Sequence, residues 1–287
     1  MASPVLSSSA SERCLLTVLT LHTAFTHVKQ QRKGEVAEMS AEPLSRRDRQ
    51  RADTVREIKM TARQVLVKQG VDGLALRAVA REMGMTAPAL YRYFSSREDL
   101  VENVVADLYD ELVAVLEDAR DEARPATAPI QLLACSRAFR RWATTHHPEF
   151  GLLFGSAGGG VVPLHGMPGH EDSPAEAAAK RFGLVFAALM AEIYAERRFP
   201  IPADDEIEPP LQEQLRAWCA DFPIQLPLGV LQVFLSCWIR LYGLVCMEIF
   251  GHLKFALADA EPMFEAELHS LAGVLGVADA YAELERA

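Results

Sequence analysis

The stretch that most constrains the fold lies between residues 76 and 94, LRAVAREMGMTAPALYRYF. Apolar residues recur at helical spacing in its first half, and Gly84 follows them, where a helix C-terminus favours a residue that tolerates positive φ. Thr86 then stands at an N-cap position, from which its hydroxyl can accept the backbone N–H of Ala89. Pro88 lies in the first turn, where a missing N–H breaks no helical bond. The pattern predicts two short helices joined by a tight turn.

The second of these helices has two unlike faces. Leu90 and Phe94 are four residues apart, so both lie on the face that points to the core. The rest of its surface belongs to Tyr91, Arg92 and Tyr93. A short helix with an apolar inner face and an Arg and Tyr outer face suits the major groove of DNA. The stretch therefore predicts a helix–turn–helix that reads DNA.

Residues from about 55 to 100 resemble the DNA-binding domain of the TetR family of bacterial repressors. The resemblance rests on a helix that ends at Gly70 and on the run LALRAVAREMGMTAPALYRYFSSREDL, of which ALYRYFSSREDL is the most specific part. A second, weaker resemblance lies at residues 238–253, WIRLYGLVCMEIFGHL. This stretch is similar to the C-terminal domain of a TetR subgroup with a Trp–His–Gly signature, although Tyr242 stands where that subgroup usually has His. The resemblance implies an all-α fold: a three-helix helix–turn–helix domain and a larger helical domain that binds a ligand and dimerises.

The resemblance also implies which residues meet DNA. Base-facing positions are matched by Arg77, Ala87, Pro88, Ala89 and Arg92. Phosphate-facing positions are matched by Thr86, Tyr91, Tyr93 and Arg97. The chemistry agrees, because Arg forks onto guanine and small apolar residues meet thymine methyl groups. Tyr91 has packing in the core as an alternative, and any single Arg considered alone would be a solvated surface charge.

Charge separates the predicted DNA-binding segment from the rest of the chain. Residues 46–100 hold 12 Arg and Lys against 7 Asp and Glu, whereas residues 101–287 are net −15 within a total of −10. A basic segment on an acidic body is expected of a polyanion binder with a separate sensing or dimerising body, although acidic surfaces also serve solubility. The basic run 46–52, RRDRQRA, is either an arm that tracks phosphates or a solvated lead-in to a helix expected at 53–69.

Three domains are expected: 1–45, 46–100 and 101–287. The first is interpreted as a disordered extension or an upstream start-site artefact, with Met39 as the start; an arm that binds DNA or a partner is the alternative. The last is expected to be helical throughout apart from a Gly-rich loop at 155–174 and a connector at 200–210. Expected helices span 96–124, 130–147, 149–154, 175–198, 211–222, 226–253 and 262–277.

Composition predicts a cytoplasmic protein. The five cysteines are scattered without a C-x-x-C pair, so reduced thiols are expected. No uninterrupted run of 18 apolar residues occurs, so no membrane partner is expected. The histidines at 146–147 and those at 165 and 170 lack metal-ligand spacing, and no nucleophile elbow, P-loop or dinucleotide motif is present. Neither a cofactor, a metal nor catalysis is expected.

The expected body helices carry aromatic and Met residues that are either plain core or the lining of an apolar effector pocket. The pocket candidates are Trp142, Phe154, Phe186, Met190, Trp238 and Tyr242. Arg240, in an apolar helix, is expected to pair with a body carboxylate or with an acidic group of a ligand. Candidate residues of a dimer seam in the last helices are Leu231, Phe234, Leu235 and Leu268.

Together these features predict a homodimeric repressor that a small hydrophobic or aromatic molecule releases from a palindromic operator in double-stranded DNA. Two alternatives stay open. One is an enzyme with a helix–turn–helix appendage, which a wet polar cleft with a perturbed carboxylate or His would favour. The other is a constitutive DNA-binding dimer without ligand, which a body packed without any cavity would favour.

Overall fold

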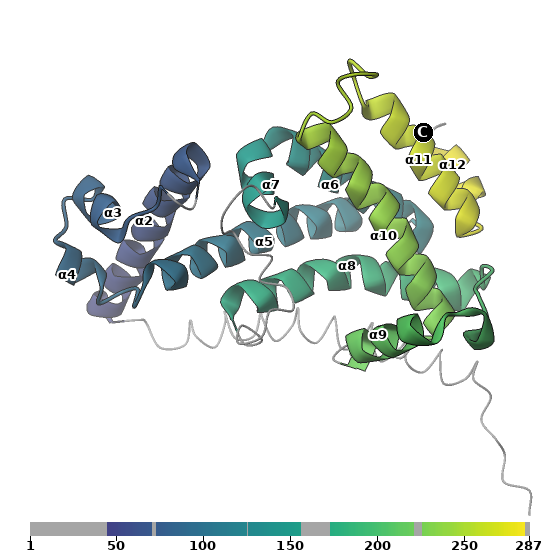
Figure 1. The fold of residues 1–287 in the computed structure, drawn as a ribbon, viewed down its shortest axis with the longest axis horizontal. Helices are drawn as coiled ribbons and strands as arrows, with labels where there is room; N and C mark the ends of the chain where they lie inside the picture. Colours follow the sequence, from purple (N-terminus) through teal and green to yellow (C-terminus); the bar gives the residue numbers. More distant parts are fainter. Residues whose placement is uncertain (1–44, 71–72, 125, 156–172, 221–225, 285–287) are drawn as a thin grey trace, which may run out of the picture. The chain divides into compact units, whose positions relative to one another are not determined.

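The computed structural model describes residues 45–70, 73–124, 126–155, 173–220 and 226–284. Every regular element in these ranges is a helix, which confirms the all-α prediction. Figure 1 shows these helices along the chain. By their contacts, they divide into two compact units. One unit comprises residues 45–122 and 135–185; we call it the head-bearing unit, because it contains the predicted helix–turn–helix, which we call the head. The other, the C-terminal unit, comprises residues 123–134 and 186–284. The expected N-terminal extension and most of the expected Gly-rich loop lie outside the described residues.

The head-bearing unit begins with α2 (Arg46–Gln69), which starts earlier than the helix expected at 53–69. The Ser45 hydroxyl accepts the N–H of Asp48 at 3.1 Å, and Asp48 places a negative charge in the first turn. Because this cap precedes the basic run, residues 46–52 form helical turns. The run therefore belongs to the helix itself, and because its side chains are exposed, contact with DNA phosphates stays a prediction.

Three further helices complete the head: α3 (Leu76–Glu82), α4 (Ala87–Leu90) and the start of α5 (Arg97–Glu122). Their apolar side chains meet those of α2 in one small core. Its members, each at most 6% exposed, are Ile58, Ala62, Val65, Leu66, Leu74, Leu76, Val79, Ala80, Leu90, Phe94 and Leu100. Removing this area from water is the main favourable term that holds the short α3 and α4 in place.

Beyond the head, α5 continues with a buried stripe at every fourth residue, from Leu100 to Leu116. The last part of α6 (Ala128–Thr145), α7 (His147–Phe154) and the first half of α8 (Pro174–Arg197) pack in the same unit. Five aromatic rings form a cluster there with centroids 4.8–6.1 Å apart: Tyr109, Phe139, Phe150, Phe154 and Phe182. His146 interrupts the helical structure between α6 and α7, one residue before the position where α6 was expected to end.

The C-terminal unit continues from α6 and α8 into a 3-10 turn, η1 (Asp204–Glu206), and α9 (Pro209–Ala220). The long α10 (Leu228–Ile249) ends before residue 253, because Gly251 takes a left-handed φ of 74° in the turn that follows. The helix expected at 262–277 corresponds to α11 (Glu261–Val274), and a further helix that was not expected, α12 (Ala278–Leu284), follows it. Gly276, with φ 63°, separates them.

Arg240 joins α10 to α11. Its Nε lies 2.5 Å from Oε1 of Glu267, and its Nη2 donates to the hydroxyl of Ser270 at 2.8 Å. The expected pairing with a body carboxylate is therefore confirmed. The cysteines at 135, 219, 237 and 246 are free, and burial raises the pKa of the Cys135 thiol to about 12, so it stays neutral at ordinary pH.

Candidate functional site

The turn between α3 and α4 is a Schellman motif. The N–H of Gly84 donates to the carbonyl of Arg81 at 3.1 Å, and the N–H of Met85 donates to that of Ala80 at 2.8 Å. Gly84 has a φ of 65° and has nothing within 4 Å of the position a Cβ would occupy. Glycine is therefore required there by backbone conformation and not by space.

The next helix, α4, is a single turn that starts after Thr86. The expected capping bond from the Thr86 hydroxyl is not made; the Thr86 carbonyl instead accepts the N–H of Ala89 at 2.9 Å. With no capping bond, the exposed hydroxyl is available to a phosphate. Leu90 and Phe94 are 0% and 3% exposed, so the predicted inner face is confirmed and the remaining side chains point outward.

The nine predicted DNA-contacting residues lie on α3, just before α4, on α4, in the turn after it and at the start of α5, and none of them is buried. Tyr91 is 51% exposed, so it does not pack as core. Arg77 and Arg92 are exposed, and Arg97 has its Nε 3.2 Å from Oε1 of Glu98. The arrangement keeps all nine available to a partner, and their individual roles stay predictions.

Arg51 of α2 was not among the predicted site residues. Its Nη2 donates to the backbone carbonyl of Arg92 at 3.4 Å, and its Cζ lies 5.1 Å from the centre of the Tyr93 ring. It therefore supports the end of residues 86–93, which we call the reading segment, by a hydrogen bond and a cation–π contact. Its membership of a basic run was visible in the sequence, but a contact across 41 positions was not.

The six effector-pocket candidates fall into both units. Trp142 and Phe154 belong to the head-bearing unit, where Trp142 donates its indole N–H to Glu111 at 3.2 Å and Phe154 sits in the aromatic cluster. In the C-terminal unit, the Trp238 ring lies 5.7 Å from Phe186 and stacks on Tyr242 at 5.3 Å. Met190 is the candidate that lines an apolar cavity.

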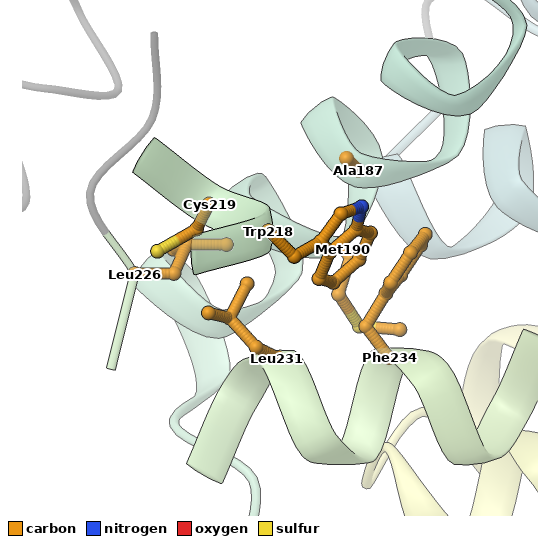
Figure 2. Close-up of a pocket in the computed structure, with 7 residues that line it drawn as sticks. All are labelled: Ala187, Met190, Trp218, Cys219, Leu226, Leu231 and Phe234. Carbon is orange, nitrogen blue, oxygen red and sulfur yellow. The ribbon is translucent and has the colours of Figure 1, made fainter. Parts of the chain in front are cut away.

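This cavity lies between α8, α9 and α10 and has a volume of about 20 Å³ (Figure 2). Its lining is Ala187, Met190, Trp218, Cys219, Leu226, Leu231 and Phe234. Trp218 and Phe234 stack with ring centres 5.9 Å apart, and Trp218 is 38% exposed. The volume is close to that of a single water molecule, so a larger guest requires these rings to move. The sequence did not single out Trp218, because its place beside α8 and α10 depends on long-range packing.

The described residues contain no group of three or more His, Cys, Asp or Glu placed to hold a metal ion. His146 stacks on Trp142 with ring centres 5.0 Å apart, and its Nε2 lies 3.8 Å from Glu111. The histidines at 165 and 170 lie outside the described residues.

Two family sequence models match the chain. The one described as "Bacterial regulatory proteins, tetR family" matches residues 60–104, and the one described as "Tetracyclin repressor-like, C-terminal domain" matches residues 132–271. The first begins within α2 and ends in the first turns of α5, and the second runs from α6 to α11. Both matches agree with the predicted family, while the likeness to the Trp–His–Gly subgroup stays a prediction.

Relatives and solved structures extend the match. The HTH-type transcriptional regulator Rv1816 of Mycobacterium tuberculosis is 30% identical over 232 residues, 80% of this chain and 95% of its own. Mb1846 of Mycobacterium bovis, also an HTH-type transcriptional regulator, matches equally. A proposed regulatory protein, SCO4313, shares 26% identity with a TM-score of 0.58 over 79% of this chain and 98% of its own. A protein of unknown function from Rhodococcus sp. RHA1 shares the fold, at 22% identity and a TM-score of 0.57 over 77% of this chain and 95% of its own. With relatives at this identity over most of both chains, the protein belongs to the TetR family of DNA-binding transcriptional regulators.

Proposed function

We propose that this regulator is a cytoplasmic homodimeric repressor that binds a palindromic operator and leaves it when a small apolar molecule binds the C-terminal unit. The observation that carries the proposal is the pairing of two surfaces in one chain. The head exposes a reading segment, and α10 and α11 expose apolar side chains that a single protomer leaves in water. A two-fold dimer would bury the second surface and would present two copies of the first to successive major grooves.

The apolar surface runs along both helices at helical spacing. On α10, Ile239 and Met247 are 60% and 43% exposed, and Phe250, the residue that caps the end of α10, is 42% exposed. On α11, Met263 and Val274 are 46% and 41% exposed. Spacings of 8 and 3 from Ile239 to Phe250 and of 11 on α11 keep each set on one face of its helix, and we assign these two faces to one seam.

The seam differs from the set expected from the sequence. Leu231 and Leu268 are 6% and 2% exposed and pack inside the protomer, so they are not available to a second copy. Both are apolar positions of apolar helices, and the sequence does not distinguish the inner side of such a helix from its outer side. Phe234 and Leu235 are half-buried, with Phe234 at the cavity.

A membrane is the competing explanation for the exposed side of α10. By length and composition this helix could cross a bilayer, with a mean hydropathy of 1.7 over a window that is 28% buried. The ion pair between Arg240 and Glu267 favours the dimer, because a charged pair at mid-helix is costly in lipid. We assign the exposed face of α10 to a second copy of the chain.

The apolar cavity beside Met190 supports the ligand-responsive part of the proposal. Its walls are aliphatic, aromatic and sulfur-bearing, which fits a hydrophobic or aromatic guest. Entry requires Trp218 and Phe234 to separate, so guest binding and helix packing are coupled in this unit. The alternative of a constitutive dimer is tested by whether such guests bind and alter DNA affinity.

The experiment combines oligomeric state with DNA selection. We expect the full chain to sediment as a dimer at micromolar concentration and to select a two-fold symmetric site from random duplex DNA. The aromatic probe N-phenyl-1-naphthylamine is then titrated while operator affinity is measured. A monomer that selects an unpaired site would contradict the dimer, and probe binding without any change in operator affinity would contradict the ligand response.

A further inference from the structure

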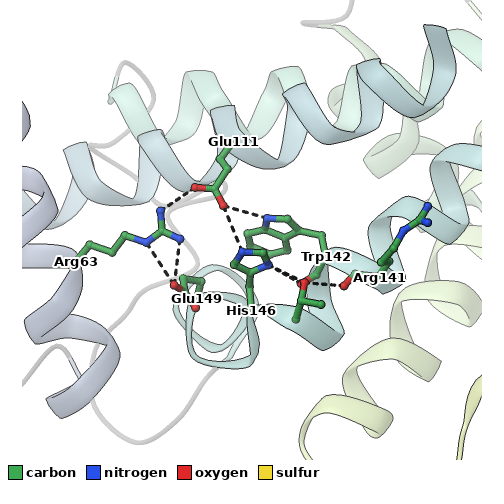
Figure 3. A network of polar contacts seen from close by, with 7 residues as sticks. Arg63, Glu111, Arg141, Trp142, His146 and Glu149 are labelled. Atoms are coloured by element: carbon green, nitrogen blue, oxygen red, sulfur yellow. Dashed lines mark hydrogen bonds and ion pairs between the residues drawn. The ribbon is translucent and has the colours of Figure 1, made fainter. Parts of the chain in front are cut away.

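A polar cluster ties the DNA-reading head to the helices behind it. Arg63 of α2 donates from Nη1 to Glu111 of α5 at 2.7 Å and from Nη2 to Glu149 of α7 at 3.0 Å. Its Nε also donates to Glu149, at 3.3 Å. Figure 3 shows the guanidinium between the two carboxylates. We call Arg63, Glu111 and Glu149 the Arg63 clamp.

Further contacts fix the orientation of the Glu111 carboxylate in the clamp. The second oxygen of Glu111 accepts the indole N–H of Trp142 at 3.2 Å and lies 3.8 Å from Nε2 of His146 (Figure 3). His146 stacks on Trp142, so the carboxylate that holds Arg63 has its own orientation fixed. The Glu149 side chain is only 13% exposed and lies in the first turn of α7, where a helix N-terminus favours negative charge. A pair this sheltered is screened less by salt than an exposed one.

The same helix that carries the clamp also carries a contact to the reading segment. Arg51 touches the Arg92 carbonyl and the Tyr93 ring, and it lies twelve residues before Arg63 in α2. Twelve residues of α-helix span about 18 Å. One end of α2 therefore supports the reading segment, and a point near its other end is held by α5 and α7. A tilt of α2 at the clamp would be carried along the helix to Arg92.

We propose that the Arg63 clamp is a positioning device for DNA recognition, which fixes the direction of the reading segment and thereby the half-site separation that the protein accepts. The clamp contacts no base in this role; Arg63 acts through the direction of α2. The inference rests on the proposed dimer, because a separation exists only between two heads. Base preference within a half-site is set by the reading residues themselves and is independent of the clamp.

The test selects DNA from a library in which two half-sites are separated by random spacers. The wild type is expected to select one spacer length. Arg63→Ala is expected to accept several lengths, to bind the wild-type operator at least about fivefold more weakly, and to keep the base preference within each half-site. Arg63→Lys, which keeps the charge without the planar fork, is expected to restore part of the spacer preference.

Two variants control for other causes. Arg56→Ala removes the same charge from a side chain that is 68% exposed and pairs with Asp53 of its own helix, so its spacer preference should match the wild type. Glu149→Gln keeps the size of the side chain and loses its charge, and it replaces Arg63→Ala if that variant does not fold. A wild type that is monomeric or selects no paired site contradicts the proposed dimer and the clamp with it. A dimeric wild type with one spacer length, and a folded clamp variant with that same length, contradict the clamp alone.

Discussion

Both units have apolar cores, but the contacts around those cores differ between the two units. In the head-bearing unit, ion pairs cross between helices: Lys59 to Asp107 at 2.6 Å, Arg63 to Glu111 at 2.7 Å and Arg181 to Asp110 at 2.6 Å. In the C-terminal unit, ion pairs join α10 to α11 and α8 to α12, but the cavity and the packing around it are apolar, and α10 and α11 expose large apolar side chains. The contrast indicates a division of labour, because directional polar contacts fix an orientation whereas apolar surface drives burial.

Each force suits the task that we assign to its unit. A reading segment must present Arg and Tyr side chains at defined positions, and the helices beneath it are joined by contacts with geometric requirements. A dimer seam and an effector cavity need area and shape, which apolar side chains supply without fixed partners. The comparison predicts that a charge placed in the seam of the C-terminal unit disrupts the dimer. It also predicts that loss of a charge in the head-bearing unit disturbs the orientation of its helices.

The largest effect is expected from a charge in the seam. Ile239→Glu places a carboxylate at a 60% exposed position on α10 and should dissociate the dimer. Loss of two-headed binding should weaken operator affinity by about 10²–10⁴-fold, the gain that linked binding gives. Sedimentation and operator titration measure both. Met60→Glu, at a 56% exposed position of α2, carries the same change to the other unit and should leave the dimer intact. A dimeric Ile239→Glu protein would refute this seam.

A smaller effect is expected at the reading segment. Arg92→Ala should cost about 1–3 kcal/mol of operator binding and relax the preference at one base pair in each half-site. Arg97→Ala should instead weaken binding on all sequences alike and lower the salt slope by about 1, as expected of a phosphate contact. Titrations on an operator and its single-base variants, at several salt concentrations, distinguish the two. Equal weakening on every sequence in Arg92→Ala would make Arg92 a phosphate contact.

The head was predictable because its determinants are local. Gly84, Thr86 and Pro88 mark the turn within a few positions of one another, and Leu90 and Phe94 mark the inner face by their spacing. The prediction that the Thr86 hydroxyl accepts the N–H of Ala89 was wrong, because in this one-turn helix the Thr86 carbonyl accepts that N–H instead. Helix ends were less predictable, as the early start of α2 and the separate α12 illustrate.

The C-terminal unit was predictable in class and not in detail. Its helices are apolar on several sides, so periodicity alone could not assign Leu231 and Leu268 to the protomer core or Ile239 to its surface. The cavity draws on three helices, and its Trp218, although it lies in an expected helix, was not predicted to line a pocket. The Arg63 clamp has the same origin, because its partners are 48 and 86 positions away.

The third effect is expected at the cavity. Met190→Trp should occupy the space that a guest would take and should weaken operator binding by about fivefold, the lower end of allosteric coupling, while the dimer persists. Met190→Leu nearly conserves volume and should bind the operator as the wild type does. Operator titration, sedimentation and circular dichroism are the measurements. Unchanged operator affinity in a folded Met190→Trp dimer would place the effector site elsewhere.

The smallest effect is expected from acid, because protonation weakens the polar contacts of the head-bearing unit and leaves apolar packing unchanged. Burial raises the pKa of Glu111, but hydrogen bonds from Arg63 and Trp142 and the Arg63 charge outweigh it, so the pKa lies below its ordinary 4.5. A carboxyl whose folded pKa is lowered stabilises the fold above its unfolded pKa, and this contribution disappears as the pH falls through the folded value.

The Arg63 clamp should therefore hold at pH 7 and weaken below pH 4.5. Because the Trp142 indole donates to Glu111, its fluorescence reports the change in a protein whose Trp218 and Trp238 are replaced by Phe. Glu111→Gln in the same background should remove the acid-dependent part of the signal, since its amide does not titrate in this range. If the Glu111→Gln protein shows the same acid transition as its parent, another carboxylate is responsible and the polar cohesion of this unit does not depend on Glu111.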